Sequence, residues 1–221
     1  MKPVTAAAAA LILVTAMPVA AETATVPADN LFPFLAKYYA LAPTQRDHFE
    51  MAFFLMVKGD RHAVSASFKA PGGDVPLTVA PDGRMSPVPS AADLNAKRQM
   101  TLAAPKGTQI GITIQLMPAI HPAARLDAGY LATAIAQAHD GAKKAAGIMS
   151  LAVPDYRTIC FRGSHAGTVT LRSGKTVALT VQKNPQTQMQ APCFTPSETP
   201  DAVQVALDTA PSDMIIVPKP N

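Results

Sequence analysis

The first pattern in the chain that could support catalysis is the serine beside a histidine in Gly163-Ser164-His165-Ala166-Gly167. A serine nucleophile needs a histidine base within hydrogen-bond reach. In the hydrolase elbow, the serine stands midway between two glycines, at a turn from a strand into a helix. Here Ser164 comes one position too early, and adjacent side chains on an extended chain point apart. We therefore interpret the segment as a glycine-flanked loop.

The histidines and acidic residues do not show the spacings of metal centres or paired acid catalysts. None of the five histidines has a second one two or four positions away, as zinc enzymes have. Asp60-Arg61-His62 could offer a carboxylate and an imidazole, but such a pair is more often a salt bridge at a hairpin end. The glutamates lie in separate segments, and most aspartates fall in turns and caps. We predict no metal site, no cofactor and no catalytic residue, so the protein is expected not to be an enzyme.

Basic side chains gather in the C-terminal third of the chain. Asp155 is the only acidic residue between positions 153 and 190. Arginine forks bind carboxylates and phosphates, so this group predicts a surface for a small anionic ligand or an anionic envelope polymer. The alternative is that the charges keep an exposed sheet soluble and protect its edge. The residues of this candidate surface are Arg157, Arg162, His165, Arg172 and Lys175.

The two cysteines, Cys160 and Cys193, favour a single structural disulfide. A redox pair is disfavoured because the Cys-x-x-Cys spacing that tunes a thiolate is absent.

The first 21 residues have the pattern of a cleavable signal peptide. Lys2 precedes an apolar run from Val4 to Ala16 that is too short to span a bilayer, and small residues stand before Glu22. We predict cleavage after Ala21, a periplasmic or secreted protein, and no transmembrane helix in the mature chain. The net charge of +4 comes from scattered residues, which argues against nucleic acid as a partner.

The elements that position these side chains are mostly strands. Alternating apolar residues between Gly, Pro and Asp turns predict ten strands: Phe49–Val57, Ala63–Phe68, Val75–Val79, Lys97–Leu102, Gln109–Met117, Thr158–Arg162, Thr168–Arg172, Thr176–Gln182, Val203–Leu207 and Met214–Val217. The Gly59-Asp60 pair predicts a hairpin, so the first five are expected to form an antiparallel meander. Residues 22–29 are expected to fray or form a short leader, and a short helix is expected from Asn30 to Ala42.

One apolar stripe at spacings of three and four predicts a long Ala-rich helix from Ala128 to Ser150, capped by Asp127. The order of strands, helix and strands predicts a mainly β fold with antiparallel sheets. We expect two small β-sandwich-like modules joined by the long helix, with a single α+β domain as the alternative. The expected boundaries are 1–21 for the signal peptide, 22–125 for the first module with its leading helix, 126–152 for the connecting helix and 153–221 for the second module.

The absence of reactive motifs favours a non-catalytic interaction or structural accessory module of the cell envelope. Such a module would dock an envelope protein through a sheet edge or through an aromatic patch. The residues of that patch are Phe32, Phe34, Tyr38 and Tyr39, which could instead be a helix covering one end of a sheet. Binding of an anionic ligand or polymer by the basic group is the second hypothesis. An unrecognised hydrolase is the third.

Overall fold

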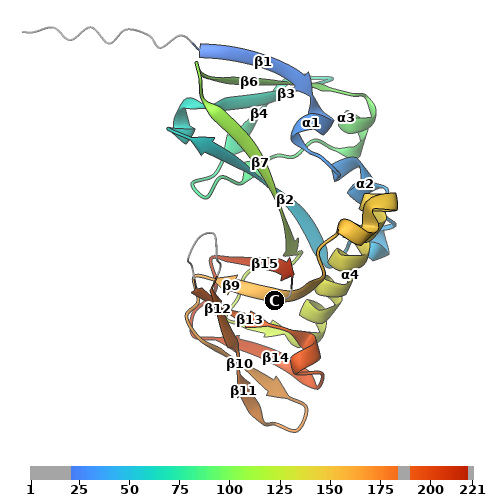
Figure 1. Ribbon diagram of the computed structural model, residues 1–221, viewed down its shortest axis with the longest axis vertical. Helices are drawn as coiled ribbons and strands as arrows, with labels where there is room; N and C mark the ends of the chain where they lie inside the picture. Colours follow the sequence, from blue (N-terminus) through green and yellow to red (C-terminus); the bar gives the residue numbers. More distant parts are fainter. Residues whose placement is uncertain (1–20, 184–189, 219–221) are drawn as a thin grey trace, which may run out of the picture.

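The chain is mainly β, as the sequence predicts, and the computed structural model contains three antiparallel sheets and one long helix (Figure 1). The structure describes residues 21–183 and 190–218. The predicted signal peptide therefore lies outside the described residues, apart from Ala21. Within the described ranges, no helix is both long enough and apolar enough to cross a membrane.

A five-stranded sheet forms the end of the molecule at the top of Figure 1. In spatial order its strands are β1 (Ala21–Pro27), β6 (Gln99–Pro105), β3 (Ser65–Ala70), β4 (Gly73–Val79) and β5 (Met85–Ser86). A long antiparallel pair, β2 (Phe49–Lys58) with β7 (Gln109–Pro118), runs from this end of the molecule toward the other. Phe53 of β2 is buried in the same apolar cluster as Phe68 of β3 and Met100 of β6, so this half is sandwich-like.

The predicted meander is wrong, because β2 and β3 lie in different sheets. The Gly59-Asp60 pair does not close a hairpin. Instead, the Asp60 side chain accepts the backbone N–H of His62 at 2.9 Å and begins the 3-10 turn η2 (Arg61–Ala63). This turn leads the chain from one sheet to the other, and β2 pairs with β7 along its whole length.

The prediction that residues 22–29 fray is also wrong. Residues Ala21–Pro27 form β1, which pairs with β6 from Ala21 opposite Pro105 to Pro27 opposite Gln99. The β-branched residues Thr23, Thr25 and Val26 favour an extended chain, and the backbone groups of β6 give β1 its partners.

The predicted helix from Asn30 to Ala42 is interrupted near its start. Pro33 lacks a backbone N–H and disfavours a helical Phe32, and Phe34 then adopts a left-handed conformation with φ of 66°. Two short helices result. Besides η2, the helical segments of this half are α1 (Ala28–Leu31), α2 (Leu35–Tyr39), the 3-10 turn η1 (Pro43–Gln45) and α3 (Ala91–Asn95).

The C-terminal half contains a four-stranded sheet and most of a six-stranded one. The four-stranded sheet has the order β11 (Thr176–Ala178), β10 (Gly167–Leu171), β14 (Ala202–Leu207) and β8 (Arg125–Asp127). The six-stranded sheet has the order β12 (Thr180–Lys183), β13 (Gln190–Phe194), β9 (Tyr156–Arg162), β15 (Asp213–Pro218), β7 and β2. The predicted strand Thr176–Gln182 is divided at Leu179, whose side chain packs against the main core while the chain crosses between sheets. A 3-10 turn, η4 (Pro196–Glu198), follows β13.

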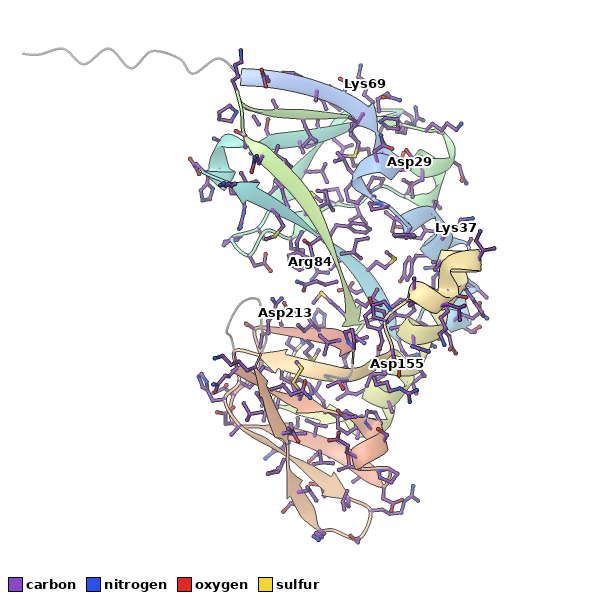
Figure 2. All side chains as sticks on the ribbon, in the orientation of Figure 1. Asp29, Lys37, Lys69, Arg84, Asp155 and Asp213 are labelled. Carbon is purple, nitrogen blue, oxygen red and sulfur yellow. A yellow bond between two sulfur atoms is a disulfide. The ribbon has the colours of Figure 1, made fainter. Side chains whose placement is uncertain are left out.

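The predicted disulfide is confirmed: Cys160 of β9 and Cys193 of β13 are bonded (Figure 2). The two residues stand directly opposite each other on paired antiparallel strands, and both are buried.

The long helix α4 (Ala128–Ala146) contacts strands of both halves, including β2 and β7 on one side and β9 and β14 on the other. It ends at Ala146, earlier than predicted, and the chain continues as the 3-10 segment η3 (Gly147–Ala152). The pairing of Ile216 in β15 with Leu116 in β7 joins the halves into one six-stranded sheet. The division into two modules stays a prediction, but its two parts share a sheet and a helix.

Replacing Asp127 by alanine is expected to lower the free energy of unfolding by about 1 kcal/mol. The Asp127 side chain accepts the backbone N–H of Tyr130 at 2.6 Å, which satisfies a donor in the first turn of α4. Urea unfolding of the variant measures the loss. Asp140→Ala, on the exposed side of the same helix, is the control and should change stability by less than about 0.5 kcal/mol. Equal losses in the two variants would contradict the capping role.

Candidate functional site

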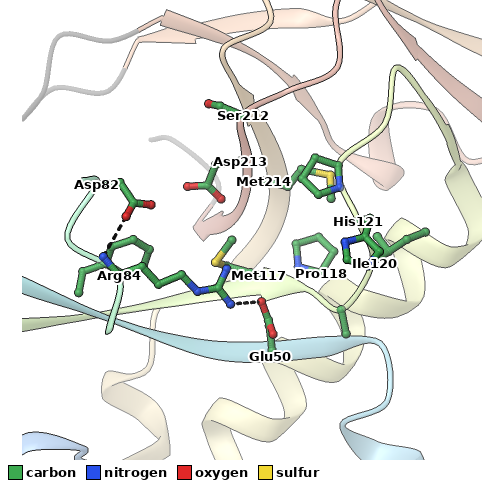
Figure 3. A pocket seen from close by; sticks show the side chains of 13 residues that line it. Glu50, Asp82, Arg84, Met117, Pro118, Ile120, His121, Ser212, Asp213 and Met214 are labelled. Atoms are coloured by element: carbon green, nitrogen blue, oxygen red, sulfur yellow. Dashed lines mark hydrogen bonds and ion pairs between the residues drawn. The ribbon is translucent and has the colours of Figure 1, made fainter. Parts of the chain in front are cut away.

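A cleft of about 540 Å³ lies between the two halves of the molecule (Figure 3). The turn before β5 contributes to one side, and the start of β15 contributes to the other. Figure 2 shows Arg84 and Asp213 facing each other across this region. The polar residues that line the cleft are Glu50, Asp82, Arg84, His121, Ser212 and Asp213.

The turn Pro81-Asp82-Gly83 holds Arg84 at the edge of the cleft. Gly83 has φ of +97°, and a Cβ on it would lie 2.9 Å from the carbonyl oxygen of Leu55, so glycine is required for this close approach. The Asp82 carboxylate accepts the backbone N–H of Arg84 at 3.0 Å. The Arg84 guanidinium then donates to Glu50 of β2 at 2.7 Å, which fixes both side chains against the strand.

Asp213 is the most buried acidic residue of the cleft, with 9% of its surface exposed. It stands opposite Arg162 on the neighbouring strand β9, and the Oδ2 atom of Asp213 forms an ion pair with the Arg162 guanidinium. Arg162 also donates to the side chain of Gln115 at 3.2 Å. The Oδ1 atom of Asp213 is buried and accepts no hydrogen bond from the described residues, and the residue lines the cleft (Figure 3).

Burial lowers the pKa of the Arg162 guanidinium, and the negative charge of Asp82 opposes that shift. The guanidinium nevertheless stays protonated at neutral pH, because arginine does not lose its proton in proteins. The charge of Arg162 is therefore available to Asp213 at every physiological pH.

Serine, histidine and carboxylate side chains from distant segments meet in this cleft. A catalytic role would require the serine hydroxyl to lie within hydrogen-bond distance of a base. The hydroxyl of Ser212 donates to the backbone carbonyl of Arg162 at 3.1 Å. The imidazole of His121 is exposed and has no hydrogen bond or ion pair with any described residue. No nucleophile and base are therefore in hydrogen-bond contact among the residues that line this cleft. The described residues also contain no group of three or more metal-ligating side chains.

The remaining lining of the cleft is apolar. Phe54 and Met117 form a small buried cluster below the cleft, and Ile120 and Met214 lie on its other sides. Figure 3 shows Asp82 and Arg84 on one side of the hollow, Ile120 and His121 on the other, and Glu50 and Asp213 between them. Pockets that hold organic ligands combine such apolar walls with a few fixed polar atoms.

The predicted basic surface is not one contiguous patch. Arg172 and Lys175 flank the turn between β10 and β11. His165 lies at the opposite end of β10, roughly 16 Å away for a strand of this length. Arg157 and Arg162 belong to β9, in another sheet.

Two of these basic side chains already have carboxylate partners. Arg157 donates to Asp155 at 2.5 Å, and Arg162 pairs with Asp213. The backbone N–H of His165 donates to Asp208. Of the predicted basic residues, Arg172 and Lys175 at the β10–β11 turn therefore remain as candidates for binding an anionic ligand.

The four predicted patch aromatics differ in exposure. Phe32 is buried against Phe53, with ring centroids 4.9 Å apart, and Tyr38 is buried with its hydroxyl donating to the carbonyl of Phe49 at 3.0 Å. Tyr39 is half-buried, and its hydroxyl donates to a backbone carbonyl. Phe34 alone among the four is exposed, at 55%. The other three are at least partly buried, which agrees with the alternative of a helix that covers one end of a sheet.

Comparisons with known proteins found no matching family model, curated protein or solved structure. The functional assignment therefore depends on the cleft itself. Sequence reasoning treated Asp82 as a turn residue and did not single out Arg84 or Asp213. One signal was present in the sequence. Asp213 stands directly before the apolar strand Met214–Val217, and Arg162 ends the strand Thr158–Arg162. Antiparallel pairing of these two strands would bring the opposite charges together.

Proposed function

We propose that the protein is an exported, non-catalytic binding module of the cell envelope, and that its cleft binds a cationic group attached to an apolar body. The single observation that carries this proposal is the Asp82 carboxylate, which lines the cleft, is exposed and forms no ion pair with any described residue. An ammonium or guanidinium group of a ligand would supply the opposite charge and hydrogen-bond donors to this carboxylate.

The charge around the cleft supports a cationic ligand. Three carboxylates (Glu50, Asp82 and Asp213) stand against two guanidinium groups (Arg84 and Arg162), although the whole chain has a net charge of +4. Each guanidinium is already bound to a carboxylate, which leaves Asp82 as the unneutralised charge. A cation therefore gains attraction here that an anion does not.

The apolar wall supports an aliphatic body on the ligand. Ile120, which is 37% exposed, offers a hydrophobic contact in the cleft, and the flexible side chains of Met117 and Met214 lie buried behind its surface. A lysine side chain of a partner has this combination of a hydrocarbon stem and a terminal ammonium. Export is supported by the leader pattern of the first 21 residues.

Three probes with the same six-carbon chain test the proposal: n-hexylammonium, hexanol and hexanoate. Binding is followed by NMR through the methyl resonances of Met117 and Met214, which line the cleft. We expect hexylammonium to shift both resonances at the lowest concentration and hexanoate at the highest, because only the cation is attracted by the acidic side.

The variant Asp82→Asn is expected to weaken hexylammonium binding about tenfold, since a hydrogen bond to a charged group contributes roughly 1.5 kcal/mol. Asp82 is exposed, so its substitution leaves the fold intact. The matched control is Asp74→Asn, also exposed but outside the cleft, which should leave binding unchanged. Tighter binding of hexanoate, or equal affinities for both variants, would overturn the proposal.

A further inference from the structure

The 3-10 segment η3, which follows α4, exposes two large aliphatic side chains almost completely. Ile148 is 101% exposed and Leu151 is 99% exposed. Residues three apart in a 3-10 helix lie on the same side, because this helix has three residues per turn. Ile148 and Leu151 therefore form one protruding apolar pair.

The backbone explains why this pair has no core to pack against. Gly147 ends α4 with φ of +57°, and its N–H donates to the carbonyls of Lys143 and Lys144. The chain then leaves the helix axis, and η3 is closed by the N–H of Val153 donating to Ser150 at 3.2 Å. Glycine is suited to this positive φ, so the sequence specifies the bend that projects the pair.

Phe34 adds a third exposed apolar side chain to the same region. It lines an apolar crevice of about 140 Å³ together with Ala145, which precedes Ile148 by three positions. The helix that Phe34 precedes, α2, packs against α4. We refer to Phe34, Ile148 and Leu151 as the apolar tip.

Basic residues outnumber acidic ones in the two segments that carry the apolar tip. Residues 30–46 and 141–154 contain no aspartate or glutamate, and their charged residues are Lys37, Arg46, Lys143 and Lys144. The three lysines are exposed and form no ion pair with any described residue. Figure 2 shows Lys37 beside the end of α4. Two acidic residues flank the second segment. Asp140 lies one helical turn before Lys143 and Lys144. Asp155 pairs with Arg157 and His139, and the charge of Lys143 also contributes to its lowered pKa.

We propose that the apolar tip inserts into the surface of an anionic lipid bilayer, with the surrounding lysines on the lipid phosphates. A protruding aliphatic pair that follows a helical turn with two exposed lysines matches the interfacial region of a membrane, where apolar side chains enter the acyl boundary and basic ones stay at the headgroups. An exported protein of the envelope meets such surfaces. This site shares no residue with the cleft and does not depend on the cleft ligand.

Co-sedimentation with vesicles tests the proposal, comparing equal parts phosphatidylglycerol and phosphatidylcholine with phosphatidylcholine alone. The chain should start at Glu22, so that the apolar leader does not contribute. We expect binding to the anionic vesicles, and at least about tenfold weaker binding for the double variant Ile148→Ser with Leu151→Ser. The double variant Lys143→Gln with Lys144→Gln should also lose about tenfold and show a smaller dependence on salt.

The matched control is the double variant Val181→Ser with Val203→Ser, which removes exposed aliphatic side chains on β12 and β14. It should bind vesicles as the unmodified protein does. All substituted side chains are exposed, so the temperature of thermal unfolding should stay unchanged in every variant. A lower unfolding temperature would reveal a variant that has lost its fold. The proposal is overturned if neither vesicle binds, if both bind equally, or if the Ile148/Leu151 variant binds normally. Loss of a cross-linked envelope protein in that variant, without loss of vesicle binding, would assign the tip to a protein partner instead.

Discussion

Replacing Arg162 by methionine is expected to lower the free energy of unfolding by roughly 3 kcal/mol. The substitution leaves the carboxylate of Asp213, which is 9% exposed, without its ion-pair partner between the two halves of the molecule. The side chain of Gln115 also loses the donor that lies 3.2 Å away. Urea unfolding followed by circular dichroism measures the loss.

A second substitution separates the buried charge from the lost packing of the arginine. Replacing Asp213 by leucine in the Arg162→Met background should restore most of the stability, because a well-packed apolar pair is often as stable as a buried ion pair. Arg172→Met, in the exposed turn after β10, is the matched control and should change stability by less than about 0.5 kcal/mol. If Arg162→Met and Arg172→Met cost the same, Asp213 does not depend on its partner.

Features encoded by neighbouring residues were predictable from the sequence. The alternation from Phe49 to Val57 locates β2 to within one residue, since a half-buried strand repeats every two positions. The apolar stripe after Asp127 locates α4 and its cap. An even number of cysteines in a chain with an export pattern was enough to predict the Cys160–Cys193 bond.

Strand pairing could not be predicted from the same local signals. The turn chemistry of Gly59-Asp60 is compatible with a hairpin, and the competing partner of β2 begins at Gln109, about fifty residues further along the chain. Which partner is chosen depends on the burial of whole sheet faces, which no short window contains. The small, polar strand Ala21–Pro27 was missed for the same reason, because its order comes from β6.

The cleft was even harder to predict from the sequence than the strand pairing. Glu50, Arg84, His121 and Asp213 come from four separate segments, and no spacing between them repeats a known motif. The wrong pairing of β2 also concealed the site, because the cleft forms where the β2–β7 pair meets β15. By contrast, the apolar tip could have been found from the sequence, since Gly147 interrupts an Ala-rich helix directly before Ile148 and Leu151.

Removing the disulfide by replacing both Cys160 and Cys193 with alanine is expected to lower the free energy of unfolding by about 4 kcal/mol. The bond closes a loop with a sequence separation of 33, and a loop of this length restricts the unfolded chain considerably. The native pairing of β9 with β13 does not need the bond for its register, because Phe194 also stands opposite Ile159. The variant should therefore fold as the parent does but unfold at a lower denaturant concentration.

Reduction of the unmodified protein separates the effect of the cross-link from that of the lost sulfur atoms. Cys160 and Cys193 are 8% and 3% exposed, so their replacement by alanine also removes buried packing. We expect a thiol reductant to lower the guanidinium concentration at the unfolding midpoint of the unmodified protein by a large amount. The midpoint of the double alanine variant should not change. If the oxidised and reduced proteins unfold at the same denaturant concentration, the bond does not stabilise the fold, and a redox role for the pair would have to be reconsidered.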